Sequence, residues 1–288
     1  MSTQARFDRM RALTARWIDR PLLALPLPIA VHRAMFEMQA RLATKTPRLP
    51  ARWERIAGVP CRIVTPPDAV RRVLYLHGGG FILGSPRTHA GLTDRIASAA
   101  RAEVIVPDYR LAPEHPFPAA VEDCEAVARA LEPGFHLGGD SAGGGIALAV
   151  LQDLLRRGTP PATVFLISPV ARVDATREAP PDHDEMLLPE AFLRRCIAAY
   201  ACDVDCSDPR LSPIHGRYDG CPPVHIEVSA REVLEGDGQA VAALLRGYGA
   251  PVEVARVEGV PHVYHLSAGY SAAADAAIER IVASLGPA

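Results

Sequence analysis

Short apolar runs alternate with longer amphipathic stretches over most of the chain. Continuous apolar runs of this length are typical of strands that are buried on both faces of a sheet. The predicted strands are 59–64, 73–76, 103–109, 135–139, 163–168, 224–229 and 252–257. Helices are predicted between them, near 88–100, 119–131, 142–157, 237–248 and 268–284. This alternation indicates an α/β fold with a mostly parallel central sheet that is flanked by helices.

Two segments depart from this alternation. Residues 1–45 predict two amphipathic helical stretches that the proline-rich sequence RPLLALPLP separates. Residues 178–207 are acidic at first and then helical through LPEAFLRRCIAAYA. We therefore divide the chain into an N-terminal helical cap segment, 1–45, and a main α/β domain, 46–288, in which 178–207 is a candidate second cap segment.

The composition narrows the classes of function. The chain has 288 residues, of which 49% are hydrophobic, enough for one large domain with a sizeable core. Its net charge of −2 favours neither a nucleic acid nor an anionic membrane as a partner. No apolar run reaches the ~18 residues of a membrane span, and scattered charges and prolines distinguish the N-terminus from a signal peptide. We therefore expect a cytoplasmic protein with no membrane or nucleic-acid partner.

The six cysteines predict neither a disulfide scaffold nor a metal site. None of them forms a C-x-x-C pair. Cys196, Cys202 and Cys206 cluster, but no histidine lies at ligand spacing from them. We expect reduced thiols and no metal.

A run of glycines follows the predicted strand at 73–76. The sequence HGGG from His77 would lie at the carboxyl end of that strand, where open α/β sheets bind ligands. Glycine lets a ligand approach the main chain closely, so the turn could hold a phosphate or an oxyanion, or be only a tight loop. The phosphate alternative is poor, because HGGGFILG does not fit G-x-G-x-x-G and no lysine follows as in a P-loop.

The sequence LGGDSAGGG contains a candidate nucleophile. Gly139 to Gly143 fits G-x-S-x-G, between the apolar FHL and the helical GIALAVLQDLLRR. Strand, sharp turn and helix is the context of a nucleophile elbow, which would place Ser141 in a strained turn at a helix N-terminus. The helix dipole favours developing negative charge there. A bare G-x-S-x-G is a weak motif, but HGGG upstream strengthens it.

A serine nucleophile requires a base, and the base requires an orienting acid; in this kind of fold the order is serine, acid, histidine. His262 lies in the loop after the last predicted strand, where the base is expected, and His265 is the alternative. His225 lies within an apolar strand, which favours core packing. His183 lies in the acidic sequence PPDHDEM, which favours a solvated surface.

The acid has three candidates. Glu232 lies just after the predicted strand 224–229, from where a carboxylate can reach the base. Glu235 and Asp237 are the alternatives, and Asp237 is expected to be the N-cap of the helix that follows. A surface ion pair with Arg231 would be the purely structural role for Glu232.

Several of these sequences together resemble one known family. HGGGF at 77–81, DYRLAPEHPFPAA at 108–120 and GDSAGG at 139–144 are similar to the motifs of the hormone-sensitive-lipase family of α/β-hydrolases, the bacterial family IV esterases. SPIHGRYDGCPPVHIEV at 212–228 and HVYHL at 262–266 are similar too. The resemblance implies an α/β-hydrolase core with a helical cap, no cofactor, and hydrolysis of carboxylic esters with short acyl chains.

The resemblance also implies roles for single residues. Ser141 matches the nucleophile and His262 the base. Gly78 and Gly79 match the oxyanion-hole glycines, with the N–H of Ala142 as the third donor. The residues His77, Asp108, Tyr109, Arg110 and Glu114 match positions that support the site structurally. A homodimer that forms through the last strand, near 252–257, is a further implication.

The acid departs from the family pattern. Many members have an aspartate in D-P-L-x-D-E, whereas this chain reads EVLEGD from Glu232. One branch of the family has a glutamate that is followed by Val-Leu, and this chain resembles that branch more closely. The resemblance therefore supports Glu232 over Asp237.

The sequence thus predicts a carboxylesterase that cleaves small-molecule esters with short to medium acyl chains through an acyl-enzyme. Phe81, Ile82 and Leu83 would begin the apolar wall of its pocket. A cap formed by 1–45 would cover the pocket, with Trp17, Met35, Phe36 and Met38 as candidates, although these side chains could equally be packed in the core.

Other functions remain open at this point. A lactone or an acetylated natural product could be the substrate of the same triad. A non-catalytic small-molecule receptor is also conceivable, but the retained His262 argues against it. An interfacial lipase is not expected, because the sequence reveals no large exposed apolar lid.

Overall fold

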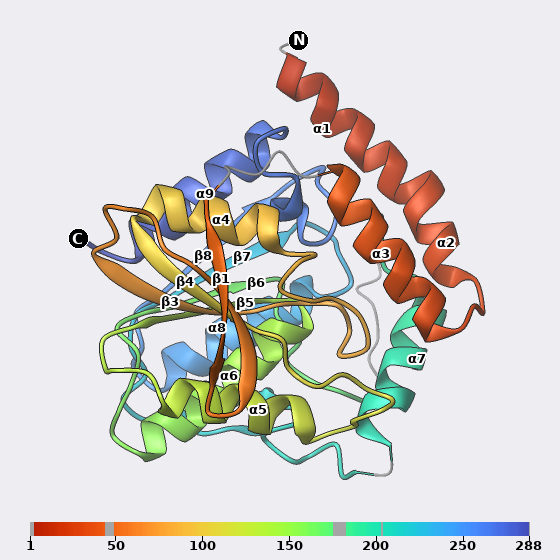
Figure 1. The fold of residues 1–288 in the computed structure, drawn as a ribbon. Coiled ribbons are helices and arrows are strands. Elements are labelled where there is room, and N and C mark those ends of the chain that lie inside the picture. Colours follow the sequence, from red (N-terminus) through yellow and green to blue (C-terminus); the bar gives the residue numbers. More distant parts are fainter. Residues whose placement is uncertain (1–2, 44–48, 175–182, 203, 288) are drawn as a thin grey trace.

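The computed structural model describes residues 3–43, 49–174, 183–202 and 204–287. In these ranges an eight-stranded sheet has the order β1-β2-β4-β3-β5-β6-β7-β8 (Figure 1). The strands are β1 (Ala51–Ile56), β2 (Val59–Val64), β3 (Arg71–Leu76), β4 (Ala102–Pro107), β5 (His136–Asp140), β6 (Val164–Ile167), β7 (Val224–Ser229) and β8 (Val252–Val257). β2 pairs antiparallel with β1 and β4, and the remaining pairs are parallel. The α/β fold with a mostly parallel sheet is confirmed.

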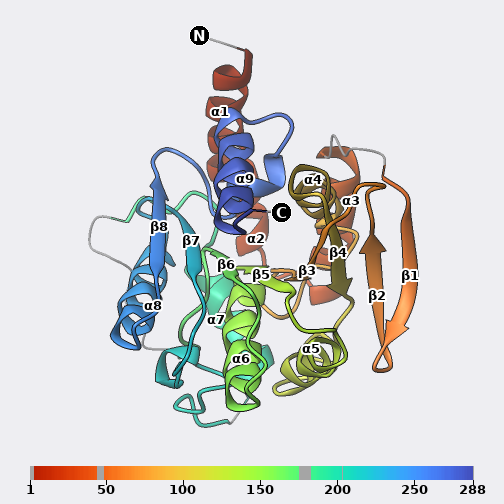
Figure 2. The same ribbon diagram turned by 90° about the vertical axis from the view of Figure 1, so that its left-hand side faces the viewer.

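Helices cover both faces of the sheet (Figure 2). One face carries α4 (Ala90–Ala100) and α9 (Ala272–Ser284), and the other carries α5 (Ala119–Arg129), α6 (Ala142–Arg156) and α8 (Glu235–Gly247). Side chains alternate along β3 between the two cores: Leu74 and Leu76 pack on the α5–α6 side, and Val73 and Tyr75 on the α4–α9 side. This is why the strand appears in the sequence as an uninterrupted apolar run.

A strand that the sequence analysis missed lies at the edge of the sheet. β1 has the sequence ARWERI, and its side chains are exposed except for Ile56, which is half-buried. An edge strand with no buried face shows neither an apolar run nor an alternating pattern, so it carries no periodic signature.

The N-terminal residues form helices at the carboxyl end of the sheet (Figure 1). α1 (Thr3–Thr14), a π-helical turn η1 (Ala15–Asp19) and α2 (Arg20–Ala24) follow one another directly, and α3 (Ile29–Ala43) runs back beside them. Pro21 does not end the helix: it follows directly on the π-helical turn η1, in which the Arg20 N–H bonds to the Ala15 carbonyl five residues back. The helical break falls after α2, at 25–28.

The helix predicted in the segment 178–207 is present as α7 (Glu190–Ala201), which lies next to α2 and α3 (Figure 1). Residues 44–45, 178–182 and 203 of the two predicted cap segments lie outside the described residues. Two short 3₁₀ turns, η2 (Pro213–His215) and η3 (Tyr264–Ser267), complete the described elements. In the described ranges no helix combines the length and apolar character that crossing a membrane requires.

Two arginines fasten these helices to one another and to the main domain. Arg33 of α3 donates from Nε to the Ile82 carbonyl at 2.7 Å and from Nη2 to the Ala112 carbonyl at 2.7 Å, and it pairs with Glu114 at 2.8 Å. Arg195 of α7 donates to the Leu27 carbonyl at 2.6 Å. The loop that contains the glycine run is therefore tied directly to α3.

Candidate active site

The loops with the predicted site residues leave the sheet at one edge. The glycine run follows β3, Ser141 follows β5, Ser168 follows β6, Glu232 follows β7 and His262 follows β8. These five strands are parallel neighbours, so their carboxyl ends meet at the same edge of the sheet. Side chains from distant parts of the chain are brought together there.

Ser141 occupies the strained turn that the motif predicted. Its φ is 52° and its ψ is −120°, immediately before α6 begins. The flanking glycines are required by close backbone approach: a Cβ at Gly143 would lie 2.1 Å from the Leu76 carbonyl oxygen, and one at Gly139 would lie 2.5 Å from the Gly143 carbonyl oxygen. The turn therefore tolerates no side chain at either position, and it presents the Ser141 hydroxyl at the edge of the sheet.

Ser141, His262 and Glu232 form one chain of hydrogen bonds. His262 Nε2 lies 2.9 Å from Ser141 Oγ, and His262 Nδ1 lies 2.6 Å from Glu232 Oε2. The second oxygen of Glu232 accepts from the Ser168 hydroxyl at 2.6 Å and from the Ser229 amide at 3.0 Å. The carboxylate is thus held by donors on both oxygens, and it orients the imidazole toward the serine.

The alternative acids point elsewhere. Asp237 Oδ2 accepts from the Ala171 amide at 2.7 Å, and Glu235 pairs with Arg256 at 2.5 Å. Asp237 is not the N-cap of α8 as predicted, because the helix begins two residues earlier with Leu234 as its N-cap. Asp237 instead lies in the first turn of α8 and holds the loop after β6.

The alternative histidines are also placed away from Ser141. His225 Nε2 bonds to Glu227 at 2.8 Å within the sheet, and His265 is fully buried with Nε2 3.8 Å from the same carboxylate. His77 stacks on Tyr109 with ring centroids 4.2 Å apart, and burial lowers its pKa to about 3. His77 therefore stays neutral and braces the glycine run, as the resemblance implied.

Burial and the neighbouring carboxylate act in opposite directions on His262. Burial lowers its pKa, but the charge of Glu232 and its hydrogen bond outweigh burial and raise the pKa above the ordinary value of 6.5. A histidine that acts as a general base must be neutral; with His262 in that predicted role, kcat/KM should fall as the pH drops through this raised pKa. The acid limb of the profile, measured with a soluble ester, should therefore lie above pH 6.5.

The same reasoning predicts the effect of removing the charge. In the variant Glu232→Gln, burial remains and the raising influence is lost, so the acid limb of the residual activity should move to lower pH. A limb that stays at the wild-type pH would show that Glu232 does not set the pKa of His262.

The glycine run corrects one sequence prediction. The Gly78 amide is buried and donates to Asp140 Oδ1 at 3.0 Å, so it is not free to bind an oxyanion. Gly79 and Gly80, with φ of 126° and 62°, line the cavity beside Ser141 instead. Neither of their amides has an acceptor among the residues that the structure describes. The available donors are thus one position further along than the resemblance implied.

Asp140 is a supporting residue that the sequence analysis missed. It is almost fully buried and accepts from the Tyr75 hydroxyl at 2.8 Å, in addition to the Gly78 amide. Burial raises its pKa, but the His89 imidazole and these hydrogen bonds outweigh burial and lower it, so the side chain is ionised. It ties the nucleophile turn to the glycine run. Its position inside G-x-S-x-G, where any residue is allowed, gave no hint of this role.

Two cavities meet at Ser141. The smaller has a volume of about 160 Å³ and includes His262, and the larger has a volume of about 550 Å³ and does not. Gly80 and Ser141 line both. A molecule bound at Ser141 can therefore extend in two directions.

The three residues of the predicted pocket wall lie in different places. Leu83 lines the smaller cavity and Phe81 lines the larger, where its ring stacks on Tyr200 with centroids 3.9 Å apart. Ile82 lines neither cavity; it is buried in the core, 1% exposed, and its carbonyl accepts from Arg33. The turn after Gly80 directs successive side chains to different sides, so three consecutive residues cannot all line one wall.

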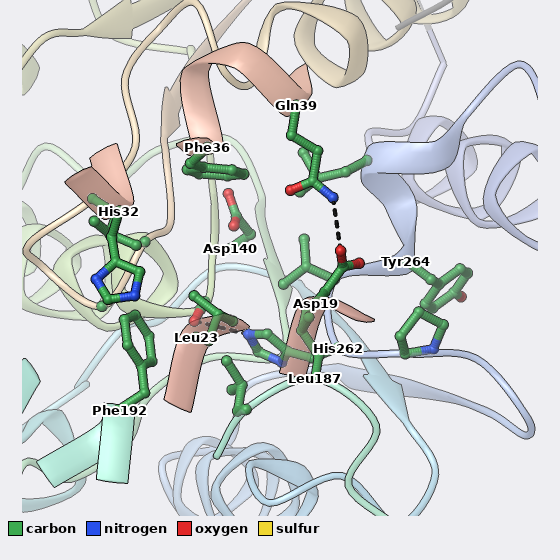
Figure 3. A pocket seen from close by; sticks show the side chains of 18 of the residues that line it. Asp19, Leu23, His32, Phe36, Gln39, Asp140, Leu187, Phe192, His262 and Tyr264 are labelled. Atoms are coloured by element: carbon green, nitrogen blue, oxygen red, sulfur yellow. Dashed lines mark hydrogen bonds between the residues drawn. The ribbon is translucent and has the colours of Figure 1, made fainter. Parts of the chain in front are cut away.

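The helices at the N-terminus close the smaller cavity (Figure 3). Met35 and Phe36, two of the predicted cap residues, line it, whereas Trp17 and Met38 do not. The cavity is mainly apolar, but Asp19 of η1, Arg11 of α1 and Gln39 of α3 form a polar group in its lining. Asp19 pairs with Arg11 at 2.5 Å and accepts from Gln39 at 3.1 Å.

A serine, a buried histidine and a buried carboxylate in this geometry, beside free backbone amides, can cleave an acyl bond in the manner of a serine hydrolase.

Comparison with known proteins supports a serine hydrolase. Residues 73–266 match a family described by the alpha/beta hydrolase fold. An acetyl-hydrolase of Streptomyces hygroscopicus is 42% identical over 208 residues, 68% of this chain and 68% of that protein. Esterase LipI of Mycobacterium tuberculosis is 36% identical over 228 residues, 74% of this chain and 71% of that protein.

Solved structures are similar over nearly the whole chain. The crystal structure of an esterase from the bacterial hormone-sensitive lipase family has a TM-score of 0.90 and 31% sequence identity, and it covers 99% of this chain and 98% of that one. The chain therefore belongs to the hormone-sensitive-lipase family of α/β-hydrolases. It is a carboxylic ester hydrolase of the serine type.

Proposed function

We propose that Ser141, His262 and Glu232 are the catalytic residues of this esterase, and that the amides of Gly79, Gly80 and Ala142 form its oxyanion hole. The observation that carries the proposal is the continuous hydrogen-bond chain from Glu232 through His262 to Ser141. Ala142 contributes its amide as the first residue of α6, where the N–H has no partner within the helix.

The reaction proceeds in two halves on these residues. His262 takes the proton from Ser141 as the serine oxygen attacks the ester carbonyl, and Glu232 stabilises the imidazolium. The amides hold the negative oxygen of the tetrahedral intermediate. His262 then protonates the departing alcohol, and a water molecule, activated by the same imidazole, releases the acid from Ser141.

The two cavities fit the two parts of an ester. The departing alcohol oxygen has to accept the proton from His262 Nε2, so the alcohol lies on the side of this histidine, in the cavity of about 160 Å³. The acyl chain then extends into the cavity of about 550 Å³ on the other side of Ser141. This arrangement favours short to medium acyl chains on small alcohols.

The assignment of the cavities predicts a change of specificity. Ile197 of α7 lines the larger cavity and Met35 of α3 lines the smaller. Ile197→Trp should reduce kcat/KM for octanoate much more than for acetate among p-nitrophenyl esters, because the bulkier ring shortens the acyl cavity. Met35→Trp is the matched control: it should leave this ratio unchanged and discriminate instead against larger alcohols. The reverse pattern would show that the acyl chain occupies the smaller cavity and the alcohol the larger.

We also propose that the helices within 3–43 together with α7 act as the cap. They supply Met35, Phe36 and Phe192 to the cavities, while the main domain supplies the reacting groups. The exposed edge strand β8 is the proposed contact of a homodimer, because its outer backbone groups have no neighbouring strand among the described residues.

An acetylated natural product is a second candidate substrate. A relative at 42% identity is named an acetyl-hydrolase. The polar group of Asp19, Arg11 and Gln39 in the lining of the smaller cavity would suit a leaving alcohol that carries hydrogen-bonding groups.

A further inference from the structure

Several large apolar side chains are exposed along α1, η1 and α2. Met10, Leu13, Trp17 and Ile18 are 56%, 51%, 71% and 53% exposed. We call this set, continued by the exposed Leu22 and Leu25 of the same segment, the cap stripe. Among the large apolar side chains that are exposed in the described ranges, only Trp53 and Val70 lie outside the N-terminal helices. The sequence analysis expected no exposed apolar lid, and the structure contradicts that expectation.

The cap stripe is not a core face left uncovered by the fold. Met10, Leu13 and Trp17 follow one another at helical spacing and lie on one face. Neighbouring positions of the same segment already contact the protein: Phe7 stacks on Tyr270 of the main domain with centroids 5.4 Å apart, and Ala15 is fully buried. The remaining apolar side chains, Met10, Leu13 and Trp17, face solvent at a cost of roughly 25 cal/mol for each Å² of apolar surface.

The fully exposed charges of the N-terminal helices are positive. Between residues 4 and 41 the exposed charged side chains are Arg6, Arg9 and Arg41, and no carboxylate is exposed there. The nearby Asp19 is turned inward to Arg11. Two carboxylates lie nearby as well: Asp184 pairs with Arg16, and Asp8 is half-buried, so arginines are in excess there but are not alone. An apolar face that contains a tryptophan and carries an excess of arginines is a composition that binds an anionic lipid–water interface. The net charge of −2 for the whole chain concealed this local excess.

The cap stripe is continuous with the catalytic cavity. Leu22 is exposed and also lines the cavity that contains Ser141 and His262. Leu23, next to it, lines the same cavity, which is otherwise mainly apolar. An apolar ester dissolved in a lipid surface would thus meet apolar side chains from the surface to the nucleophile.

We propose that the cap stripe docks this protein on an anionic lipid surface, with α1 and α2 lying in the plane of the interface. The docking itself is independent of the proposed catalytic residues; only the supply of ester from the surface rests on the proposed function. A second copy of the chain is the competing occupant of an apolar face, and the experiments below distinguish it.

The chain contains two tryptophans, which makes the contact directly observable. Trp17 lies in the cap stripe, and Trp53 lies on β1 with the Arg87 guanidinium 4.9 Å from its ring centroid. In the variant Trp53→Phe, vesicles of phosphatidylcholine and phosphatidylglycerol should shift the emission of Trp17 to shorter wavelengths. The matched variant Trp17→Phe should show no shift from Trp53. Equal shifts in both, or none in either, would overturn the proposal.

Sedimentation with vesicles tests the affinity. The wild type should bind vesicles that contain phosphatidylglycerol, and added salt should weaken binding because arginines contribute to it. The double variant Leu13→Gln/Trp17→Gln should reduce the bound fraction by about tenfold or more. The control Trp53→Gln/Val70→Gln, which replaces two exposed apolar residues elsewhere on the protein, should bind like the wild type. Binding that the first variant leaves intact would refute the proposal.

Two further measurements separate the alternatives. Neither double variant replaces a residue that lines a cavity at Ser141, so both should hydrolyse soluble p-nitrophenyl acetate like the wild type. A wild-type protein that does not hydrolyse this ester would contradict the proposed function but would leave the docking proposal intact. In sedimentation velocity without lipid, the wild type and Leu13→Gln/Trp17→Gln should have the same oligomeric state. If the wild type self-associates and this variant does not, the cap stripe is an interface between two copies and the lipid proposal is wrong.

Discussion

Replacing Ser141 with alanine should lower kcat/KM for p-nitrophenyl butyrate by about 10⁵- to 10⁶-fold, the loss that a catalytic serine typically causes. The hydroxyl is 2.9 Å from His262 Nε2, and the described site contains no other hydroxyl that the imidazole contacts. Without it no acyl-enzyme forms, and only the slow attack of water on a bound ester remains. Steady-state kinetics with the purified variant, together with its melting temperature, measure the effect.

The matched control is Ser98→Ala, which removes an exposed hydroxyl from α4. It should retain full activity and should be labelled by a fluorophosphonate, whereas Ser141→Ala should not be labelled. A wild-type protein that neither reacts with the fluorophosphonate nor turns over esters would favour the receptor alternative. Full activity in Ser141→Ala would remove the basis of the proposed mechanism.

Replacing Glu232 with glutamine should lower kcat by about 10⁴-fold while the fold is retained. Glu232 accepts from His262, from the Ser168 hydroxyl and from the Ser229 amide, so both of its oxygens act as acceptors. A glutamine has only one acceptor oxygen. Either the imidazole faces an N–H₂ group and takes the wrong tautomer, or the Ser168 and Ser229 donors lose their partner.

The comparison with Asp237→Asn decides which carboxylate is the acid. Asp237 accepts from the Ala171 amide at 2.7 Å, whereas Glu232 is the carboxylate that bonds to His262 Nδ1. Its amide variant should keep kcat within a few-fold and lose about 1 kcal/mol of stability, the net contribution of one hydrogen bond. If Asp237→Asn were the inactive variant and Glu232→Gln the active one, the assignment of the acid would be reversed.

Much of the site follows from local sequence, because its motifs encode local geometry. G-x-S-x-G requires glycine where the turn meets Leu76 and Gly143, and any chain with this strand, turn and helix places the serine in the same way. The buried strands were evident because each is apolar on both faces. β1 was missed for the converse reason, since an exposed edge strand leaves no pattern.

The identity of single partners did not follow from sequence. Asp140 and Gly78 bond to each other across 62 positions of the chain, and only that contact shows that the oxyanion donors begin at Gly79. Likewise, Glu232, Glu235 and Asp237 lie within six residues of one another, and the sequence favoured Glu232 but left the other two open. Their directions depend on where β7 ends and α8 begins.

The sequence by itself determined the fold class and the candidate nucleophile and base, because strand burial and the serine elbow are set by neighbours in the chain. Only the tertiary structure decided which carboxylate faces His262, which amides are free, and that Met10, Leu13 and Trp17 point to solvent rather than into the core. An amphipathic period tells which residues share a face of a helix. What that face meets depends on elements that are distant in sequence, and these are placed only when the whole chain has folded.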